Sequence, residues 1–150
     1  MKTSIEADKL QQLILVVDDQ LEHLQVIEQV LSNDASNTQI VTASTTSEAI
    51  DFILGQGQHV DSPRPDIVLL NMRLTDGQAR TLLATIKENH KLKQIPTIIL
   101  TPDANQDDVL NSYRQQCNSF VIKPQDLTHL SATLQVIKSF WLNLVTLPIK

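Results

Sequence analysis

Apolar residues gather in five short runs along the chain, and longer segments of mixed apolar and polar residues separate them. The runs are rich in β-branched side chains and occupy positions 13–17, 40–43, 67–70, 97–100 and 120–122. Short runs without strict alternation are typical of strands buried on both faces, as in a parallel sheet covered by helices. The pattern therefore predicts five parallel strands.

The segments between the runs repeat apolar residues at steps of three and four, which is the period of an amphipathic helix. Alternation of strands and helices predicts one α/β domain over residues 1–150, with helices on both faces of the sheet. For five strands it favours the flavodoxin-like order 2-1-3-4-5. The apolar helix positions are Leu21, Leu24, Ile27, Val30 and Leu31; Ala49, Ile50, Ile53 and Leu54; Leu82, Leu83 and Ile86; and Val109, Leu110 and Tyr113.

The end of the chain carries more apolar residues than one helix face needs. Steps of three and four continue over 126–147, which predicts an extended C-terminal helix. The stripe ends in four large apolar residues, and a homodimer contact explains them better than an unusually buried helix does. These residues are Phe140, Trp141, Leu144 and Val145.

The charge balance and the single cysteine narrow the class of protein. Lys and Arg total 12 against 17 for Asp and Glu, so the net charge of −5 offers no basic surface to a nucleic-acid backbone. Cys117 has no second cysteine for an intramolecular disulfide, and no apolar run approaches the roughly 20 residues that span a bilayer. We expect a cytoplasmic protein that binds neither nucleic acid nor membrane.

Polar residues that could form one chemical site follow the first, third, fourth and fifth predicted strands. Asp18 and Asp19 follow the first, Asn71 the third, Thr101 the fourth and Lys123 the fifth. Because function in parallel sheets gathers at the carboxyl ends of the strands, we expect these side chains to share one pocket. Paired carboxylates suit Mg²⁺, and a hydroxyl and an ammonium group suit phosphoryl oxygens. The residues predict a phosphoryl-acceptor pocket without its acceptor. The plainer alternatives are a helix cap made by Asp18 and Asp19, which Asp19 is expected to supply in either case, and simple turns at Thr101 and Lys123.

Together with their strands, these residues resemble the receiver domain of two-component response regulators. The matching motifs are Val-Val-Asp-Asp at 16–19, Asp-Ile-Val-Leu-Leu at 66–70 with the position after it, Ile-Ile-Leu-Thr at 98–101 and Phe-Val-Ile-Lys-Pro at 120–124. Thr101 lies 30 residues and Lys123 52 residues after position 71, both typical of the family. The resemblance covers nearly the whole chain and implies a flavodoxin-like (βα)5 signalling domain that is not an enzyme.

The resemblance also implies three roles for the pocket residues, namely holding Mg²⁺, sensing the phosphoryl group and switching conformation. Phe120 has two interpretations that fit equally well. It is either the aromatic residue that switches conformation in the family or an ordinary core residue of the strand. The implied Mg²⁺ ligands are Asp18, Asp19, Asn71 and the backbone carbonyl of Arg73; the implied phosphate-sensing pair is Thr101 and Lys123; and the implied switch pair is Thr101 and Phe120.

Three further segments resemble the small stand-alone regulators that are paired with cyanobacterial phytochrome histidine kinases. They are the long loop at 55–65, the Lys-Gln-Ile-Pro segment at 93–96 and the chain end at 139–148. This narrower resemblance implies a phytochrome sensor histidine kinase as the upstream partner, and dimerisation through the C-terminal face.

The chain departs from the receiver family at the acceptor position and in the loop after it. Receivers carry aspartate where this chain has Asn71, and a neutral amide is a poor nucleophile for a phosphoryl group. The loop resembles the family sequence Leu-Pro-Asp-Gly-x-Gly, with Thr75 in place of proline and Ala79 in place of the last glycine. Because Asn71 removes one negative charge, we expect the pocket to bind Mg²⁺ only weakly.

Three functions stay open at this point. The first is a single-domain response regulator of a phosphorelay, and the second is a pseudo-receiver that docks on a partner without being phosphorylated. The third, a flavodoxin-type electron carrier, shares the fold but needs a Ser-, Thr- or Gly-rich phosphate loop where this chain has Asp-Asp-Gln-Leu at 18–21. Asn71 favours the second function, whereas the other strand-end residues, Asp18, Asp19, Thr101 and Lys123, favour the first.

Overall fold

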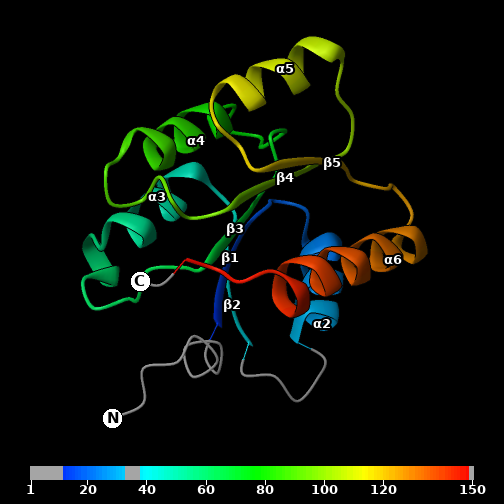
Figure 1. Ribbon diagram of the computed structural model, residues 1–150, viewed down its shortest axis with the longest axis horizontal. Helices are drawn as coiled ribbons and strands as arrows, with labels where there is room; N and C mark the ends of the chain where they lie inside the picture. Colours follow the sequence, from blue (N-terminus) through cyan, green and yellow to red (C-terminus); the bar gives the residue numbers. More distant parts are fainter. Residues whose placement is uncertain (1–11, 33–37, 149–150) are drawn as a thin grey trace.

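Five parallel strands form the centre of the protein in the computed structural model, which describes residues 12–32 and 38–148 (Figure 1). The other residues of the domain predicted over 1–150 lie outside the described part. The strand order β2-β1-β3-β4-β5 confirms the predicted flavodoxin-like arrangement. Some strands are longer than the apolar runs because backbone pairing extends past them, as where Gln12 pairs with Thr38. The strands are Gln12–Val17 (β1), Thr38–Ala43 (β2), Ile67–Leu70 (β3), Thr97–Thr101 (β4) and Ser119–Ile122 (β5).

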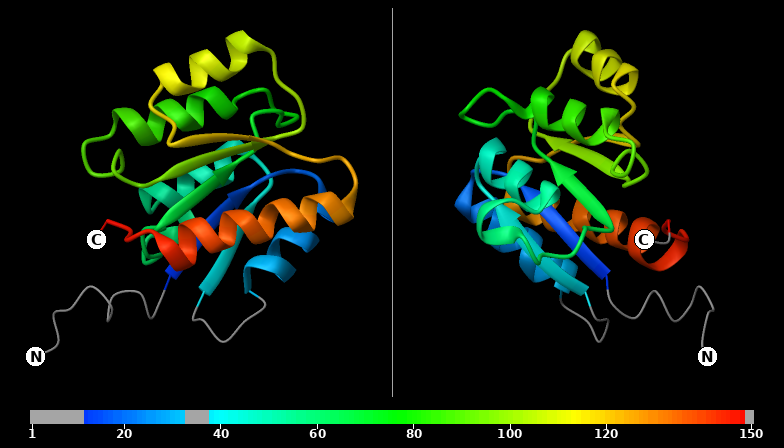
Figure 2. Two further views of the ribbon diagram at one scale, coloured as in Figure 1. Left: turned by 45° about the vertical axis from the view of Figure 1, so that its right-hand side comes forward. Right: turned by 90° about the vertical axis from the view of Figure 1, so that its left-hand side faces the viewer.

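Helices cover both faces of this sheet, as Figure 1 and Figure 2 show. α2 and α6 lie side by side on one face, and α3 and α4 pack on the other, with α5 beyond α4 near β5. None of the helices within the described ranges has the length and apolar character needed to cross a membrane. The helices are Leu21–Ser32 (α2), Thr46–Leu54 (α3), Ala79–Glu88 (α4), Gln106–Arg114 (α5) and Leu127–Lys138 (α6).

Side chains of the central strands alternate between two apolar cores. In β1, Leu13, Leu15 and Val17 belong to the core under α3 and α4, whereas Ile14 and Val16 belong to the core under α2 and α6. All five are 4% exposed or less. Successive residues of a strand point to opposite faces of the sheet, so a strand covered on both faces needs a continuous apolar run. This is the physical reason for the short unbroken runs in the sequence.

The edge of the sheet at β5 is less buried than its apolar sequence predicts. β5 has one neighbouring strand, and its Ile122 is 51% exposed. Leu110 and Tyr113, part of the apolar stripe expected in α5, are 47% and 46% exposed, and Ser112 is the buried residue of this helix. The expected stripe is shallow because an edge strand offers a helix less sheet surface to cover.

The helix predicted over 126–147 is shorter and divided. Asp126 caps α6 through its side chain, and the chain continues after α6 as the π-helical segment η2, Ser139–Leu144. The N–H of Val145 closes this segment by donating to the carbonyl of Phe140 at 2.9 Å, a step of five residues instead of four. The wider turn ends the helical path before position 147, which corrects the predicted boundary.

Part of η2 is buried within the chain and part faces outward. Leu142 is 8% exposed, and the partly buried Trp141 packs on the core under α2 and α6. Phe140 and Leu144 are 47% and 69% exposed, and Val145 is half-buried. Of the four residues expected at a dimer contact, Trp141 is therefore used largely within the chain, while Phe140 and Leu144 remain available.

We predict that Leu134→Ala lowers the free energy of unfolding by about 2–5 kcal/mol, because this residue of α6 is fully buried and its truncation leaves a cavity. Urea unfolding followed by circular dichroism measures the change. The matched variant Leu21→Ala removes a side chain that is 69% exposed, and it should change the free energy by less than about 0.5 kcal/mol. Similar losses in both variants would contradict the packing of α6 in the core.

Candidate functional site

Polar side chains from four strand ends meet at one edge of the sheet. β1 and β3 are neighbours, β3 and β4 are neighbours, and β4 and β5 are neighbours, so their carboxyl ends lie side by side. Asp18, Asn71, Thr101 and Lys123 are each 2% exposed or less at this edge. Buried polar groups require partners inside the protein, and these four supply them to one another. We call this group of four residues the strand-end pocket.

Asp18 and Lys123 form a buried ion pair in the strand-end pocket. Lys123 Nζ lies 2.7 Å from Asp18 Oδ2, and the side chains are 0% exposed for Lys123 and 3% exposed for Asp18. Asp18 Oδ1 accepts two further hydrogen bonds, from the Gln20 N–H at 3.0 Å and from Asn71 Nδ2 at 3.2 Å. Both carboxylate oxygens are thus occupied by donors of this chain, which offsets the cost of burying the charge.

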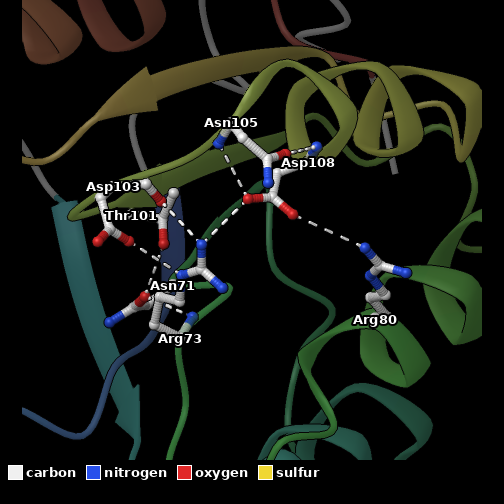
Figure 3. Close-up of polar contacts among 7 residues, drawn as sticks. All are labelled: Asn71, Arg73, Arg80, Thr101, Asp103, Asn105 and Asp108. Atoms are coloured by element: carbon white, nitrogen blue, oxygen red, sulfur yellow. Dashed lines mark hydrogen bonds and ion pairs between the residues drawn. The ribbon is translucent and has the colours of Figure 1, made fainter.

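Asn71 is held in one orientation by the groups around its amide. Its Oδ1 accepts hydrogen bonds from the Arg73 N–H at 2.8 Å and from the Thr101 hydroxyl at 3.1 Å (Figure 3), while its Nδ2 donates to Asp18. An ionised carboxylate at position 71 has no N–H to donate and would add a second negative charge beside Asp18. The neutral amide therefore suits a pocket in which the ion pair already balances the charge.

Asp19 turns toward the loop that follows β3. Its Oδ2 accepts hydrogen bonds from the Thr75 N–H at 2.7 Å and from the Thr75 hydroxyl at 2.6 Å. Burial acts to raise the pKa of Asp19, but the bonds from Thr75, together with the Asp19 backbone and the charge of Lys123, hold this pKa below its ordinary value. The carboxylate that could have capped α2 instead makes a contact 56 residues along the chain.

The carboxylate of Asp76 connects the loop that follows β3 to the start of α3. Asp76 accepts hydrogen bonds from the Thr46 N–H at 2.7 Å, the Thr46 hydroxyl at 3.1 Å and the Gln78 N–H at 2.9 Å. The bond from the Thr46 N–H is the main cause that lowers the pKa of Asp76. Gly77 supplies the left-handed backbone of the turn (φ 70°), and the methyl group of Ala79 is buried in the core at the start of α4. Alanine in place of the family's glycine is therefore accommodated.

The side chain of Arg73 connects this loop to the start of α5 (Figure 3). Its Nε lies 3.1 Å from Asp103 Oδ1 and its Nη2 lies 3.0 Å from Asp108 Oδ2, while Arg80 Nη2 approaches Asp108 Oδ1 at 3.9 Å. Asp108 also completes the capping box of α5 with Asn105. The sequence pointed only to the backbone carbonyl of Arg73, because its side-chain partners lie 30 and 35 residues away and leave no local pattern.

The two residues expected to act as a switch, Thr101 and Phe120, line a small cavity of about 60 Å³ beside the Arg73 contacts. Phe120 is half-buried and packs partly on the core under α3 and α4, and its N–H donates to the Tyr113 hydroxyl at 3.1 Å. It is thus a strand residue that also borders the cavity. Both interpretations of Phe120 fit this position.

One histidine lies closer to the strand-end pocket than its sequence context suggests. His23 of α2 is 6% exposed, and its Nδ1 has no hydrogen-bond partner among the described residues. Burial and the positive charge of Lys123 lower the pKa of His23, and the opposing effect of Asp18 does not reverse this. The lowered pKa favours the neutral form of the ring beside the pocket.

The strand ends offer oxygen ligands to a divalent cation, but the side chains of Asp18, Asp19 and Asn71 already accept hydrogen bonds. Carboxylate and amide oxygens of Asp18, Asp19 and Asn71 suit Mg²⁺ or Mn²⁺ in kind. Within the described part of the chain, no group of three or more His, Cys, Asp or Glu side chains is placed to hold a metal ion. A cation would have to compete with Lys123 for Asp18 and with Thr75 for Asp19, which favours weak binding.

Comparison with known proteins agrees with this geometry. Residues 14–135 match the family described as the response regulator receiver domain. The response regulator Rcp1 of Synechocystis sp. is 36% identical over 136 residues, which cover 91% of this chain and 92% of Rcp1. The probable methanogenesis regulatory protein FilR2 of Methanothrix harundinacea is 30% identical over 132 residues, which cover 87% of this chain and 84% of FilR2.

Solved structures of two similar proteins overlay on nearly the whole chain. The Mn²⁺-bound form of Rcp1 has a TM-score of 0.88 at 36% identity and covers 92% of this chain and 99% of its own. The phosphorylated cyanobacterial phytochrome response regulator RcpA has a TM-score of 0.89 at 31% identity and covers 93% of this chain and 99% of its own. With the family match over most of its length, the chain belongs to the response regulator receiver domain family.

Proposed function

We propose that this chain acts as a single-domain response regulator of a cytoplasmic two-component phosphorelay, with Asn71 in the acceptor position. The observation that carries the proposal is the position of Asn71 at the end of β3, bonded to both Thr101 and the Asp18–Lys123 ion pair. Receiver domains carry the phosphoryl-accepting aspartate at the corresponding position. On this proposal, one side chain separates the chain from a phosphorylatable regulator.

Each pocket residue has a distinct part in the proposed chemistry. Phosphoryl transfer depends on positioning and charge stabilisation, which Thr101 and Lys123 would supply to the phosphoryl oxygens. A divalent cation held by the oxygens of Asp18 and Asp19 and the Arg73 carbonyl would neutralise charge on the same oxygens. The amide of Asn71 provides neither the nucleophile nor the negative charge that attracts the cation.

We propose that the upstream partner is a sensor histidine kinase of the phytochrome type. RcpA is a phytochrome response regulator, and the 31% identity extends over 93% of this chain. The long loop at 55–65 and the chain end at 139–148 resemble the same group of regulators. The net charge of −5 argues against nucleic acid as an alternative partner.

Asn71→Asp should supply the phosphoryl-accepting carboxylate that the chain lacks. With Mg²⁺ and acetyl phosphate, or with a phosphorylated histidine kinase, this variant should gain the mass of one phosphoryl group while the unsubstituted chain gains none. The reason is that Thr101 and Lys123 keep their positions and only the nucleophile changes. Intact-protein mass spectrometry measures the gain.

Asn143→Asp is the matched control, because it makes the same chemical change at an exposed residue of η2. It should stay unlabelled. If Asn71→Asp also stays unlabelled, the pocket has lost more than its acceptor, and the pseudo-receiver function described below takes the place of the phosphorelay function.

A phosphorylation-independent pseudo-receiver is the second candidate function. The observation in its favour is that the polar groups of the strand-end pocket are hydrogen-bonded or ion-paired to one another. Asp18 is occupied by Lys123 and Asn71, and Asn71 is occupied by Thr101, so the folded state needs neither cation nor phosphoryl group. Such a domain would signal by docking on a partner protein.

Because the polar groups of the strand-end pocket bond to one another, Lys123→Met should be destabilising even in the presence of a metal chelator. The variant should lose about 3–5 kcal/mol of unfolding free energy, because Asp18 is left buried without its counter-charge. Lys93→Met removes an exposed ammonium group and should stay within about 0.5 kcal/mol of the unsubstituted chain. Urea denaturation distinguishes the two, and comparable stabilities would argue against a structural ion pair.

We also propose that the chain forms a homodimer through the outward side of η2. Phe140 and Leu144 are 47% and 69% exposed, and Val136 of α6 is another exposed apolar residue, at 69%. Removing the whole end of the chain is a poor test, because Leu142 and Leu147 belong to the core under α2 and α6 or pack against it. Substitution of exposed residues leaves that core intact.

The double variant Phe140→Glu with Leu144→Glu should raise the dimer dissociation constant by about 100-fold or more, since burial of each such side chain favours association by roughly 1.5–3 kcal/mol. Sedimentation equilibrium measures this constant. The control Val60→Glu alters a residue that is equally exposed, at 69%, in the loop before β3, and it should have no effect. A double variant that still sediments as a dimer would exclude η2 as the interface.

A further inference from the structure

Thr75, in the loop that follows β3, makes two contacts that proline cannot make. Proline is the residue at this position in the family sequence that the loop resembles. The Thr75 N–H and hydroxyl both donate to one oxygen of Asp19, at 2.7 Å and 2.6 Å. Proline has neither a backbone N–H nor a hydroxyl group. The chain therefore holds a carboxylate that lies next to the strand-end pocket in a way that depends on this one residue.

We infer that Thr75 limits the divalent-cation affinity of the strand ends by holding the Asp19 carboxylate in a hydrogen-bonded position for which a cation must compete. The inference rests on the proposed cation position at Asp18 and Asp19. It assigns a role to a residue that itself offers no charge to the cation.

Both hydrogen bonds from Thr75 converge on Oδ2 of Asp19. A carboxylate oxygen has two lone pairs, so a cation that uses this oxygen must displace or weaken at least one of the bonds. Charge-assisted hydrogen bonds of this length are among the stronger ones in proteins. The cost of disturbing them is subtracted from the binding of any cation that uses Oδ2 of Asp19.

The two carboxylates accept their hydrogen bonds from different residues. Asp18 is occupied by Lys123 and by the Asn71 amide, whereas Asp19 is occupied by Thr75. Changing Asn71 therefore acts through Asp18 and through the added charge, and changing Thr75 acts through Asp19. Both changes act at one cation position, so the double variant measures how far their effects on cation affinity are coupled.

The loop around Thr75 has other anchors, so a substitution there should leave its path intact. Asp76 is bonded to Thr46 on one side, and Arg73 is paired with Asp103 and Asp108 on the other. Removal of the Thr75 hydroxyl should leave Asp19 Oδ2 with one of its two bonds from this residue, the one from the backbone N–H, without releasing the loop. Thr75→Val keeps the shape of the side chain and the backbone N–H of residue 75. It removes only the hydroxyl group.

The test measures Mn²⁺ binding by electron paramagnetic resonance of the free ion, in the unsubstituted chain and in the Asn71→Asp background. Thr75→Val should bind Mn²⁺ about three- to tenfold more tightly in both backgrounds, a factor in keeping with one hydrogen bond to a partly exposed charged group. Thr75→Ser keeps the hydroxyl and should match the parent protein. Asp19→Asn should weaken binding in both backgrounds.

Thermal unfolding adds a second measurement on the same proteins. Thr75→Val should lower the Tm without metal, because a hydrogen bond is lost, and should enlarge the rise in Tm on adding Mn²⁺. A residue with a purely structural role would lower both Tm values equally.

Equal or weaker Mn²⁺ binding by Thr75→Val, with Asp19→Asn still weakened, would overturn the inference while leaving the proposed cation position in place. Unchanged binding by Asp19→Asn would overturn both, because Asp19 would then not be a ligand. The two failures are therefore distinguishable.

Discussion

A buried ion pair between Asp18 and Lys123 organises the strand ends on which the rest of the site depends. The two residues lie 105 positions apart and come from opposite sides of β3 and β4 in the sheet. Either charge alone at this depth would cost several kcal/mol, so the carboxyl ends of β1 and β5 must be brought together. Thr101 and Asn71, at the ends of the strands between them, are thereby enclosed in the same pocket.

The charge balance of this pocket explains why its centre tolerates an amide. The ion pair is neutral as a whole, and Asn71 adds a donor for Asp18 and an acceptor for Thr101 without adding charge. A carboxylate at the same position would leave one uncompensated negative charge at a buried site, and a divalent cation would relieve it. The side chain at position 71 thus governs both the nucleophile and the need for a cation.

The ion pair within the strand-end pocket and the contacts that lead away from the pocket differ in burial. The Asp18–Lys123 pair is almost completely buried, whereas the side chains of Arg73 and Asp103 are 48% and 82% exposed. Exposed ion pairs contribute little to stability. The ion pairs of Arg73, which join the loop after β3 to the start of α5, are therefore easier to break than the Asp18–Lys123 pair. That link reaches the side of the molecule where Leu110 and Tyr113 are nearly half exposed. A buried pocket is therefore joined by weak, exposed contacts to an edge that carries exposed apolar side chains.

The sequence by itself determined the five strands, their helices and the residues of the strand-end pocket. Each of these depends on a local pattern: an apolar run buried on both faces, a helical spacing, or a polar residue directly after a strand. The same reasoning located Asp18, Asn71, Thr101 and Lys123, because parallel strands bring their carboxyl ends to one edge.

Only the tertiary structure decided how those residues are used. The bonds from Thr75 to Asp19 span 56 residues and the contact from Arg73 to Asp108 spans 35, so neither is visible in any short segment. The shallow burial of α5 follows from its place over an edge strand, and the π-helical turn of η2 brings Leu142 into the core beside α2 and α6. Such features depend on distances between side chains that meet only after the sheet has formed, and a sequence pattern carries no such distances.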